Sequence, residues 1–272
     1  MMHGTNDVFA ALHNEAKVTN DFLVSGGGQL ADASYARREN FFFAFSALSV
    51  GLERLGKLCL LLDRFIEHQG CFPSTSLLKQ TASRDLKALY ELSQRIIVAR
   101  HLRLPHQTKL DHPAHVGILD VLTAFAKGSK YAEIDLLAGV TAHDDPMLEW
   151  AMKVDANLYR DCLSEQQKAA IASSPADLSS MLGSMLQGLS IATENNGHGE
   201  FYVACQRSSL HVLLSPYRML YAAQVARYWV ELLIELEPIA RDVRDGCIPP
   251  FQSSFAFFTN DDGRFLGAAS WQ

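Results

Sequence analysis

The chain has 272 residues, of which 48% are hydrophobic and 20% are charged, and its formal net charge is −6. This composition excludes an intrinsically disordered chain, and the acidic balance argues against an extended basic surface for nucleic acid. The five cysteines form no CxxC pair, which fits reduced thiols. The first residues also lack the basic and apolar regions of a secretion signal. We therefore expect a folded cytoplasmic protein.

The first two elements are predicted to be helices joined by a glycine turn. Apolar residues recur at helical spacing over 6–22, and the Ser-Gly-Gly-Gly run at 25–28 is expected to end that helix. A second, much longer helix is predicted over 34–68, where a Gly-Cys-Phe-Pro sequence stops it.

The long helix contains an apolar run at 41–62 that has the length of a membrane span. Glu53, Arg54 and Lys57 lie inside it, and three charges in a spanning helix are costly. We therefore expect a helix enclosed by other helices in an all-α protein, with no membrane contact. Glu53 and Lys57 are four residues apart and share a face, where they form either a functional pair or a structural ion pair.

The rest of the chain is also predicted to be mainly helical, with boundaries marked by capping residues, prolines and apolar periodicity. The segment 201–214 is compatible with either strand or helix. Further helices are expected over 83–104, 112–128, 130–139, 146–163, 177–193 and 216–243.

The C-terminal segment predicts a short β-hairpin. Two short apolar runs flank Asn-Asp-Asp-Gly at 260–263, which is a typical hairpin turn. A glycine-rich loop at 195–199 separates the later helices from the earlier ones. We predict a helical bundle over 1–140 and a helical extension with the hairpin over 141–272, unless the two form one continuous domain.

Three segments together carry a family resemblance. They are LERLGKLCLLL at 52–62, the helix start SRDLKAL at 83–89, and GSKYAEIDLL at 128–137. This pattern, which covers about residues 34–140, resembles the HEPN superfamily, in particular its abortive-infection type V-like branch. The resemblance implies a HEPN-like all-α bundle, often dimeric, in a bacterial defence or stress response.

The resemblance also implies where function lies. Active members are metal-independent ribonucleases that use an Arg followed closely by a His, whereas relatives without that pair act as binding modules. Here Lys130 stands where Arg is favoured, and Asp135 rather than His follows it. We therefore expect a non-catalytic homodimer that binds RNA or a protein. The resemblance favours a polar cluster of Lys130, Glu133 and Asp135 that faces the long helix, and a solvated face is the alternative. The candidate binding residues are Glu53, Lys57, Lys130, Tyr131 and Asp135.

An active ribonuclease is the second functional hypothesis, with Arg95 and His101 as its catalytic residues. Histidine titrates near neutrality and can move protons, and arginine binds phosphate oxygens. Six positions correspond to about 600° of helical turn, so the two side chains share a face only if the helix ends near Arg100. Arg100 and His106 have the same spacing. The alternative explanation is that these arginine and histidine residues lie near the end of the helix because the helix dipole favours positive charge there.

No metal or cofactor is expected. The segments 111–115 (DHPAH) and 143–145 (HDD) contain potential ligands, but HExxH and paired ExxH spacings are lacking, and capping explains the aspartates better. A third hypothesis is a helical enzyme with a small-molecule pocket, which predicts a mostly apolar cavity with converging polar groups.

Overall fold

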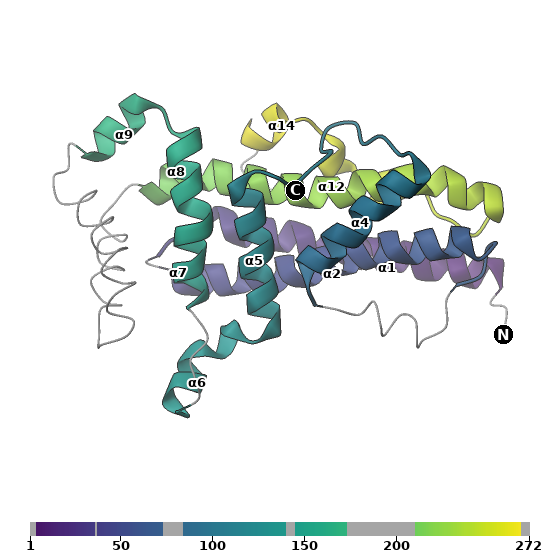
Figure 1. Ribbon diagram of the computed structural model, residues 1–272, viewed down its shortest axis with the longest axis horizontal. Coiled ribbons are helices and arrows are strands. Elements are labelled where there is room, and N and C mark those ends of the chain that lie inside the picture. Colours follow the sequence, from purple (N-terminus) through teal and green to yellow (C-terminus); the bar gives the residue numbers. More distant parts are fainter. Residues whose placement is uncertain (1–3, 36, 73–83, 140–144, 173–209, 268–272) are drawn as a thin grey trace.

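The computed structural model describes residues 4–35, 37–72, 84–139, 145–172 and 210–267 (Figure 1). These residues are mainly helical and include no β-strand, so the all-α prediction is confirmed for them. None of their helices has the length and apolar character needed to cross a membrane. The predicted helix over 177–193 and the loop at 195–199 lie outside the described residues.

The described residues form α-helices, two 3-10 helices (η1, η3) and one π-helical turn (η2). They are α1 (Thr5–Ala31), α2 (Arg38–Glu67), α4 (Leu86–Arg100), α5 (Pro113–Lys127), η1 (Ser129–Tyr131), α6 (Ala132–Leu137), α7 (Pro146–Trp150), η2 (Ala151–Asp155), α8 (Ala156–Cys162), α9 (Glu165–Ala172), α12 (Leu210–Val243), α13 (Phe251–Ser254), η3 (Ala256–Thr259) and α14 (Asp262–Gly267).

The long helices α1, α2 and α12 run side by side along the molecule, and shorter helices cross them (Figure 1). α4 packs across α2, whereas α5 packs on α2, α4 and the segment formed by α7, η2 and α8. α6 projects away from this body (Figure 1). The two halves of the sequence therefore share packed surfaces, and a domain boundary near residue 140 stays a prediction.

Glycines allow α1 and α2 to approach each other closely. The prediction that the glycine run at 25–28 ends the first helix is wrong, because α1 continues through it. A Cβ atom on Gly26 would lie 2.7 Å from Leu48 Cγ, and one on Gly51 would lie 2.9 Å from Leu23 Cδ2. Tertiary packing thus outweighs the low helix propensity of glycine at this crossing.

α12 begins earlier than predicted. It starts at Leu210, so Pro216, the predicted first residue, lies inside the helix, as does Pro238. Next to Pro216, the Ser215 hydroxyl donates to the backbone carbonyl of Ala31 at 2.8 Å. This contact anchors the first part of α12 to the end of α1.

The β-hairpin prediction is wrong, because residues 251–267 form α13, η3 and α14. Within the supposed hairpin turn, Asp261 Oδ1 accepts the backbone N–H of Arg264 at 2.9 Å, as an N-capping residue does. Phe255, Phe258 and Phe265 are completely buried. The segment therefore closes the bundle as short helical turns.

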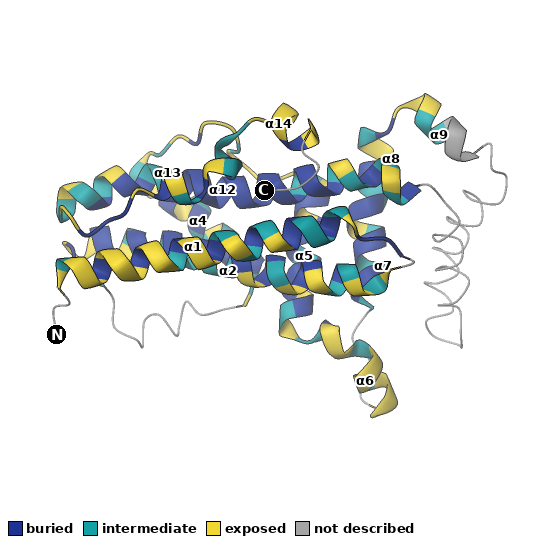
Figure 2. Ribbon diagram, turned by 180° about the vertical axis from the view of Figure 1, so that it is seen from behind, coloured by how far each residue is buried: buried dark blue, intermediate teal, exposed yellow. Residues whose placement is uncertain are grey.

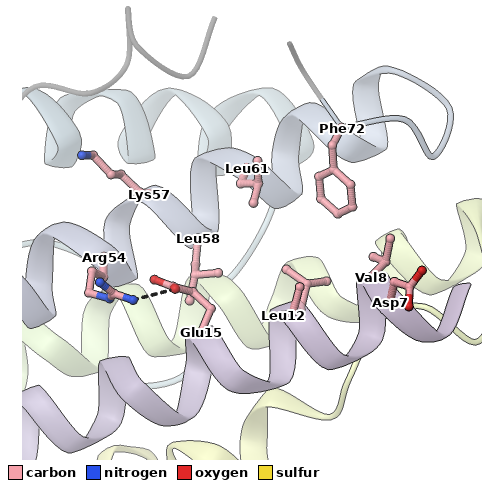
Figure 3. A pocket seen from close by; sticks show the side chains of 10 residues that line it. Asp7, Val8, Leu12, Glu15, Arg54, Lys57, Leu58, Leu61 and Phe72 are labelled. Carbon is pink, nitrogen blue, oxygen red and sulfur yellow. Dashed lines mark hydrogen bonds and ion pairs between the residues drawn. The ribbon is translucent and has the colours of Figure 1, made fainter. Parts of the chain in front are cut away.

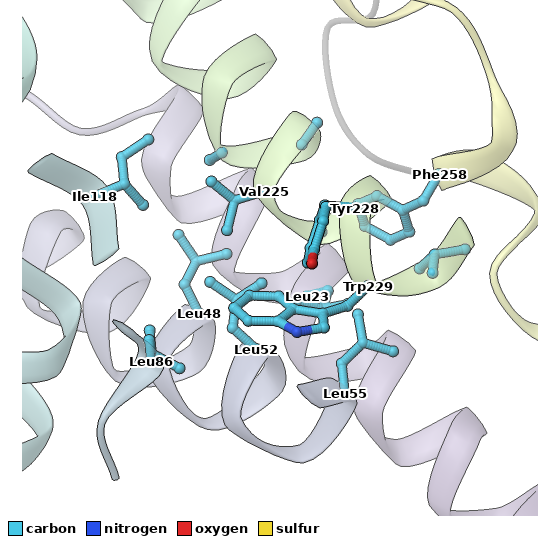
Figure 4. Close-up of a cluster of buried hydrophobic side chains, with 14 of the residues drawn as sticks. Leu23, Leu48, Leu52, Leu55, Leu86, Ile118, Val225, Tyr228, Trp229 and Phe258 are labelled. Atoms are coloured by element: carbon cyan, nitrogen blue, oxygen red, sulfur yellow. The ribbon is translucent and has the colours of Figure 1, made fainter. Parts of the chain in front are cut away.

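The core is centred on Trp229 of α12 (Figure 4). Its indole N–H donates to the Ser93 hydroxyl on α4 at 2.9 Å, and the Cys59 thiol on α2 donates to its carbonyl at 3.3 Å. Buried side chains from α1, α2, α4, α5, η3 and α12 gather around it, including Leu23, Leu48, Leu52, Leu55, Leu86, Ile118, Val225, Tyr228 and Phe258.

Candidate functional site

The catalytic pair predicted from the sequence lies at the end of α4. Arg95 is exposed in the helix, the helix ends at Arg100, and His101 follows in the left-handed conformation at φ 55° and ψ 36°. The helix end that the pair requires is therefore present. Within the described ranges, neither Arg95 nor His101 makes a side-chain hydrogen bond or ion pair. Their approach to a common substrate stays a prediction.

The second pair of the same spacing is engaged elsewhere. Arg100 Nε donates to Asp63 Oδ1 at 2.6 Å, and Arg100 Nη2 donates to the Asp63 carbonyl at 3.0 Å. His106 Nδ1 lies 2.7 Å from Glu231 Oε1, and the His106 backbone N–H donates to the same carboxylate. Arg100 and His106 therefore hold the end of α4 and the segment after it against α2 and α12.

Residues 84–109 form a cationic segment on an acidic protein. They contain six Lys and Arg residues and two acidic residues, whereas the whole chain carries a net charge of −6. Lys87 and Arg95 are exposed on α4, and Arg84, Arg103 and Lys109 are exposed beside it. Lys87 pairs with Asp120 and Arg100 pairs with Asp63, so the exposed Arg84, Arg95, Arg103 and Lys109 are the side chains whose N–H groups can hold phosphate oxygens.

The predicted Glu53–Lys57 pair is present, and its Lys57 lines a groove between α1 and α2 (Figure 3). Lys57 Nζ donates to Glu53 Oε1 at 2.5 Å, and both side chains are partly exposed. The groove has a volume of about 530 Å³. Most of its lining is apolar and comes from Val8, Ala11, Leu12, Leu58, Leu61 and Phe72.

Arg54 and Asp7 lie at opposite ends of this groove (Figure 3). Arg54 Nη2 donates to Glu15 Oε2 at 2.7 Å, and the guanidinium lies 5.9 Å from the centre of the Phe22 ring. Arg54 Nε is buried, and among the described residues it has no hydrogen-bond partner. The groove therefore combines an apolar floor with a guanidinium that is only partly engaged.

The other predicted binding residues lie on the projecting turn that contains α6. Lys130 Nζ lies 5.1 Å from the centre of the Tyr131 ring, and Asp135 is half-buried. They are separate from the Glu53–Lys57 pair, which lies on the groove. α6 has no buried residue, and Figure 2 shows it mostly exposed. Large apolar side chains are exposed on and beside it: Tyr131 by 52%, Ile134 and Leu136 by 63% each, and Leu137 by 88%.

A buried ion pair that sequence reasoning missed joins α12 to η2. Arg218, which is 1% exposed, donates from Nε and Nη2 to the carboxylate of Asp155 at 2.8 and 2.5 Å. The Tyr35 hydroxyl and the Trp150 indole N–H donate to the same carboxylate at 2.6 and 3.0 Å. Because the carboxylate is saturated with donors and buried, this network is structural.

A second, partly buried network lies further along α12. Gln224 and Arg227 donate to the Asp262 carboxylate at 2.9 and 2.7 Å, which ties α14 to the bundle. Since the Gln224 amide nitrogen is used in this way, its oxygen accepts from His115 Nε2 at 2.7 Å. Burial lowers the pKa of His115 to about 4. The imidazole is therefore neutral at pH 7, with its proton on Nε2.

The segments considered for metal ligands contain helix caps where they are described, although in 111–115 the capping residue is His112 and not the aspartate. His112 Nδ1 accepts the Ala114 N–H at 3.1 Å at the start of α5, and Asp145 Oδ1 accepts the Met147 N–H at 2.9 Å at the start of α7. Residues 143 and 144 lie outside the described residues. In the described part of the chain, no three His, Cys, Asp or Glu residues are grouped as metal ligands.

Comparison of the chain with protein-family models, curated proteins and solved structures found no match.

Proposed function

We propose that this chain is a HEPN-like binding module of a bacterial defence or stress response, and that it acts by dimerisation and partner binding rather than by RNA cleavage. The observation that carries the proposal is the exposed apolar surface of α6. Contiguous exposed apolar groups on a soluble protein typically mark an interaction site. The same turn contains Lys130, Tyr131 and Asp135, which are candidate binding residues predicted from the sequence.

The size of this surface predicts a weak, concentration-dependent association. A stable dimer buries about 800 Å² on each partner, which is more than a six-residue helix supplies. Analytical ultracentrifugation over a wide concentration range should therefore show an average mass that rises with protein concentration. Ile134→Asp and Leu137→Asp should each reduce the association at least tenfold, because each places a charge in the buried contact.

Val212→Asp is the matched control, because Val212 is 61% exposed on α12, away from α6. It should leave the association unchanged, and circular dichroism should show the same helical content in all three variants. Wild-type protein that stays monomeric at every concentration would refute dimerisation through α6. So would α6 variants that associate like the Val212 control.

Metal-independent RNA cleavage is the second candidate function. It is favoured by the end of α4 at Arg100, by the exposed Arg95 and His101, and by the cationic segment 84–109. This candidate predicts cleavage of single-stranded RNA in EDTA that falls by about 10²- to 10⁴-fold in His101→Ala. The binding-module proposal predicts no cleavage by either protein, so cleavage that depends on His101 would overturn it.

A further inference from the structure

The groove between α1 and α2 has hydrogen-bond donors at one end that its own residues do not use (Figure 3). Arg54 and Lys57 are three residues apart on α2 and so lie on one face of the helix. A guanidinium has five N–H groups, and Arg54 gives one of them to Glu15. An ammonium has three, and Lys57 gives one to Glu53.

The Nε of Arg54 is a further donor that the groove residues leave without an acceptor. A buried donor without an acceptor costs about 1 to 3 kcal/mol relative to one that is paired. Arg54 Nε is in this state among the described residues, beside a groove that opens to solvent. Because Nε itself is buried while the Arg54 side chain is about one-third exposed, a ligand oxygen in the groove would meet the Nη groups of the guanidinium rather than Nε. Carboxylate and phosphate head groups have oxygens that can accept these bonds, and one guanidinium can serve two anionic groups at once.

The rest of the groove is suited to an unbranched apolar chain. Asp7 and Glu15 are eight residues apart on α1, which corresponds to roughly 12 Å along the helix. Leu12, Leu58 and Leu61 lie along this length. The volume of about 530 Å³ is within the range of small-molecule sites.

The two ends of the groove differ in charge, because Arg54 and Lys57 lie with Glu15 at one end and Asp7 lies at the other. Glu15 and Glu53 already balance Arg54 and Lys57, so short-range hydrogen bonds rather than net charge must hold the head group. At the far end, the Asp7 carboxylate would repel a second anionic group. We propose that this groove binds a single-chain amphiphile whose one anionic head meets Arg54 and Lys57 and whose apolar tail lies along Leu12, Leu58 and Leu61.

Isothermal titration calorimetry with dodecanoate, below its micelle concentration, tests the proposal on the full chain. We expect saturable binding at one site and a raised melting temperature, because a ligand that binds only the folded state stabilises it. Decanoate should bind roughly tenfold more weakly, since it buries two fewer methylene groups. Dodecylamine and dodecanedioate should bind at least tenfold more weakly than dodecanoate, because the first lacks the anionic head and the second places a carboxylate near Asp7.

Variants separate the head site from the tail site. Arg54→Gln and Lys57→Gln should each weaken dodecanoate binding about tenfold, as expected for the loss of a charged hydrogen bond. Arg64→Gln is the matched control, because Arg64 is exposed on the same helix and outside the groove. Leu61→Gln should reduce the dependence on chain length.

Circular dichroism and gel filtration first establish that each variant is folded. The proposal is overturned if dodecanoate shows no saturable binding to the wild-type protein. It is also overturned if dodecylamine or dodecanedioate binds as tightly as dodecanoate, or if the Arg54 and Lys57 variants bind like the Arg64 control. None of these results depends on α6, so the outcome is independent of the proposed dimerisation.

Discussion

Replacing Asp155 with Ala should destabilise the protein far more than the loss of a surface ion pair. The carboxylate of Asp155 is the acceptor for Arg218, Tyr35 and Trp150. Its removal leaves the guanidinium of Arg218, which is 1% exposed, buried without its counter-charge, and leaves a hydroxyl and an indole N–H without this acceptor. Breaking a buried ion pair in this way costs about 3 to 5 kcal/mol.

Urea unfolding followed by circular dichroism measures this effect. With an m value of about 3 kcal/mol per molar urea, the loss corresponds to a midpoint that is lower by about 1 to 1.7 M. Asp120→Ala is the control, because Asp120 pairs with the half-exposed Lys87 on the surface. Such pairs contribute about 0 to 1 kcal/mol.

A double-mutant cycle with Arg218→Met tests the physical reason. Once the guanidinium is gone, Asp155→Ala no longer strands a buried cation, so the double variant should be at least about 2 kcal/mol more stable than the sum of the single effects predicts. Effects that add within about 0.5 kcal/mol would refute the reasoning. So would an Asp155→Ala variant as stable as the Asp120 control.

Two further predictions concern packing and pH. Gly117→Ala should lower the free energy of unfolding by about 1 to 3 kcal/mol, because the new Cβ would lie 2.4 Å from the Lys153 carbonyl oxygen. Gly28→Ala has open space at its Cβ and should raise the free energy of unfolding by about 0.5 to 1 kcal/mol. Thermal unfolding of the two variants compares these effects. His115 has a folded pKa of about 4, below its ordinary value of 6.5, so its contribution is complete above pH 6.5 and is lost as the pH falls toward 4. Urea midpoints at pH 7 and 4 should therefore reveal an acid-dependent loss of up to about 3 kcal/mol, and His115→Phe should reduce that loss; an unchanged dependence in this variant would contradict the assignment.

Local sequence signals predicted that the long helices exist, because apolar periodicity and capping residues act within a few residues, but they misplaced the end of α1 and the start of α12. The α2 helix and the i, i+4 pair of Glu53 and Lys57 are examples of correct predictions. So is the start of α7, where Asp145 caps the helix and Pro146 takes its first position. The two partners of each such interaction are only a few residues apart, so both can be recognised in one short stretch of sequence.

The predictions of the β-hairpin and of the end of the first helix failed because the same residue types can serve two structural purposes. Asn-Asp-Asp-Gly is a hairpin turn in a strand context, but Asp261 uses the same chemistry to cap a helical turn. Gly26 is a helix terminator by propensity, but here it allows α1 to meet α2. Only the neighbouring elements decide between the two uses, and they are distant in the sequence.

Contacts between residues that are distant in the sequence were the least predictable part for the same reason. Arg218 and Asp155 are 63 residues apart, and no spacing rule connects them. The sequence shows Arg54 only as a charge inside a long apolar run. Its position at the end of a groove depends on Glu15, which lies on another helix. The sequence does not predict the exposed apolar surface of α6, because the family resemblance points only to polar residues near Lys130 and Tyr131.

The central position of α12 has a consequence for how the protein is made. The Cys59 thiol of α2 contacts the carbonyl of Trp229, which follows 170 residues later. At a synthesis rate of about 5 to 20 residues per second, the ribosome needs roughly 10 to 35 s to supply that partner. During this interval α12 is not yet present to cover the apolar faces of α1 and α2. The nascent chain should therefore bind strongly to chaperones that shield newly synthesised apolar helices.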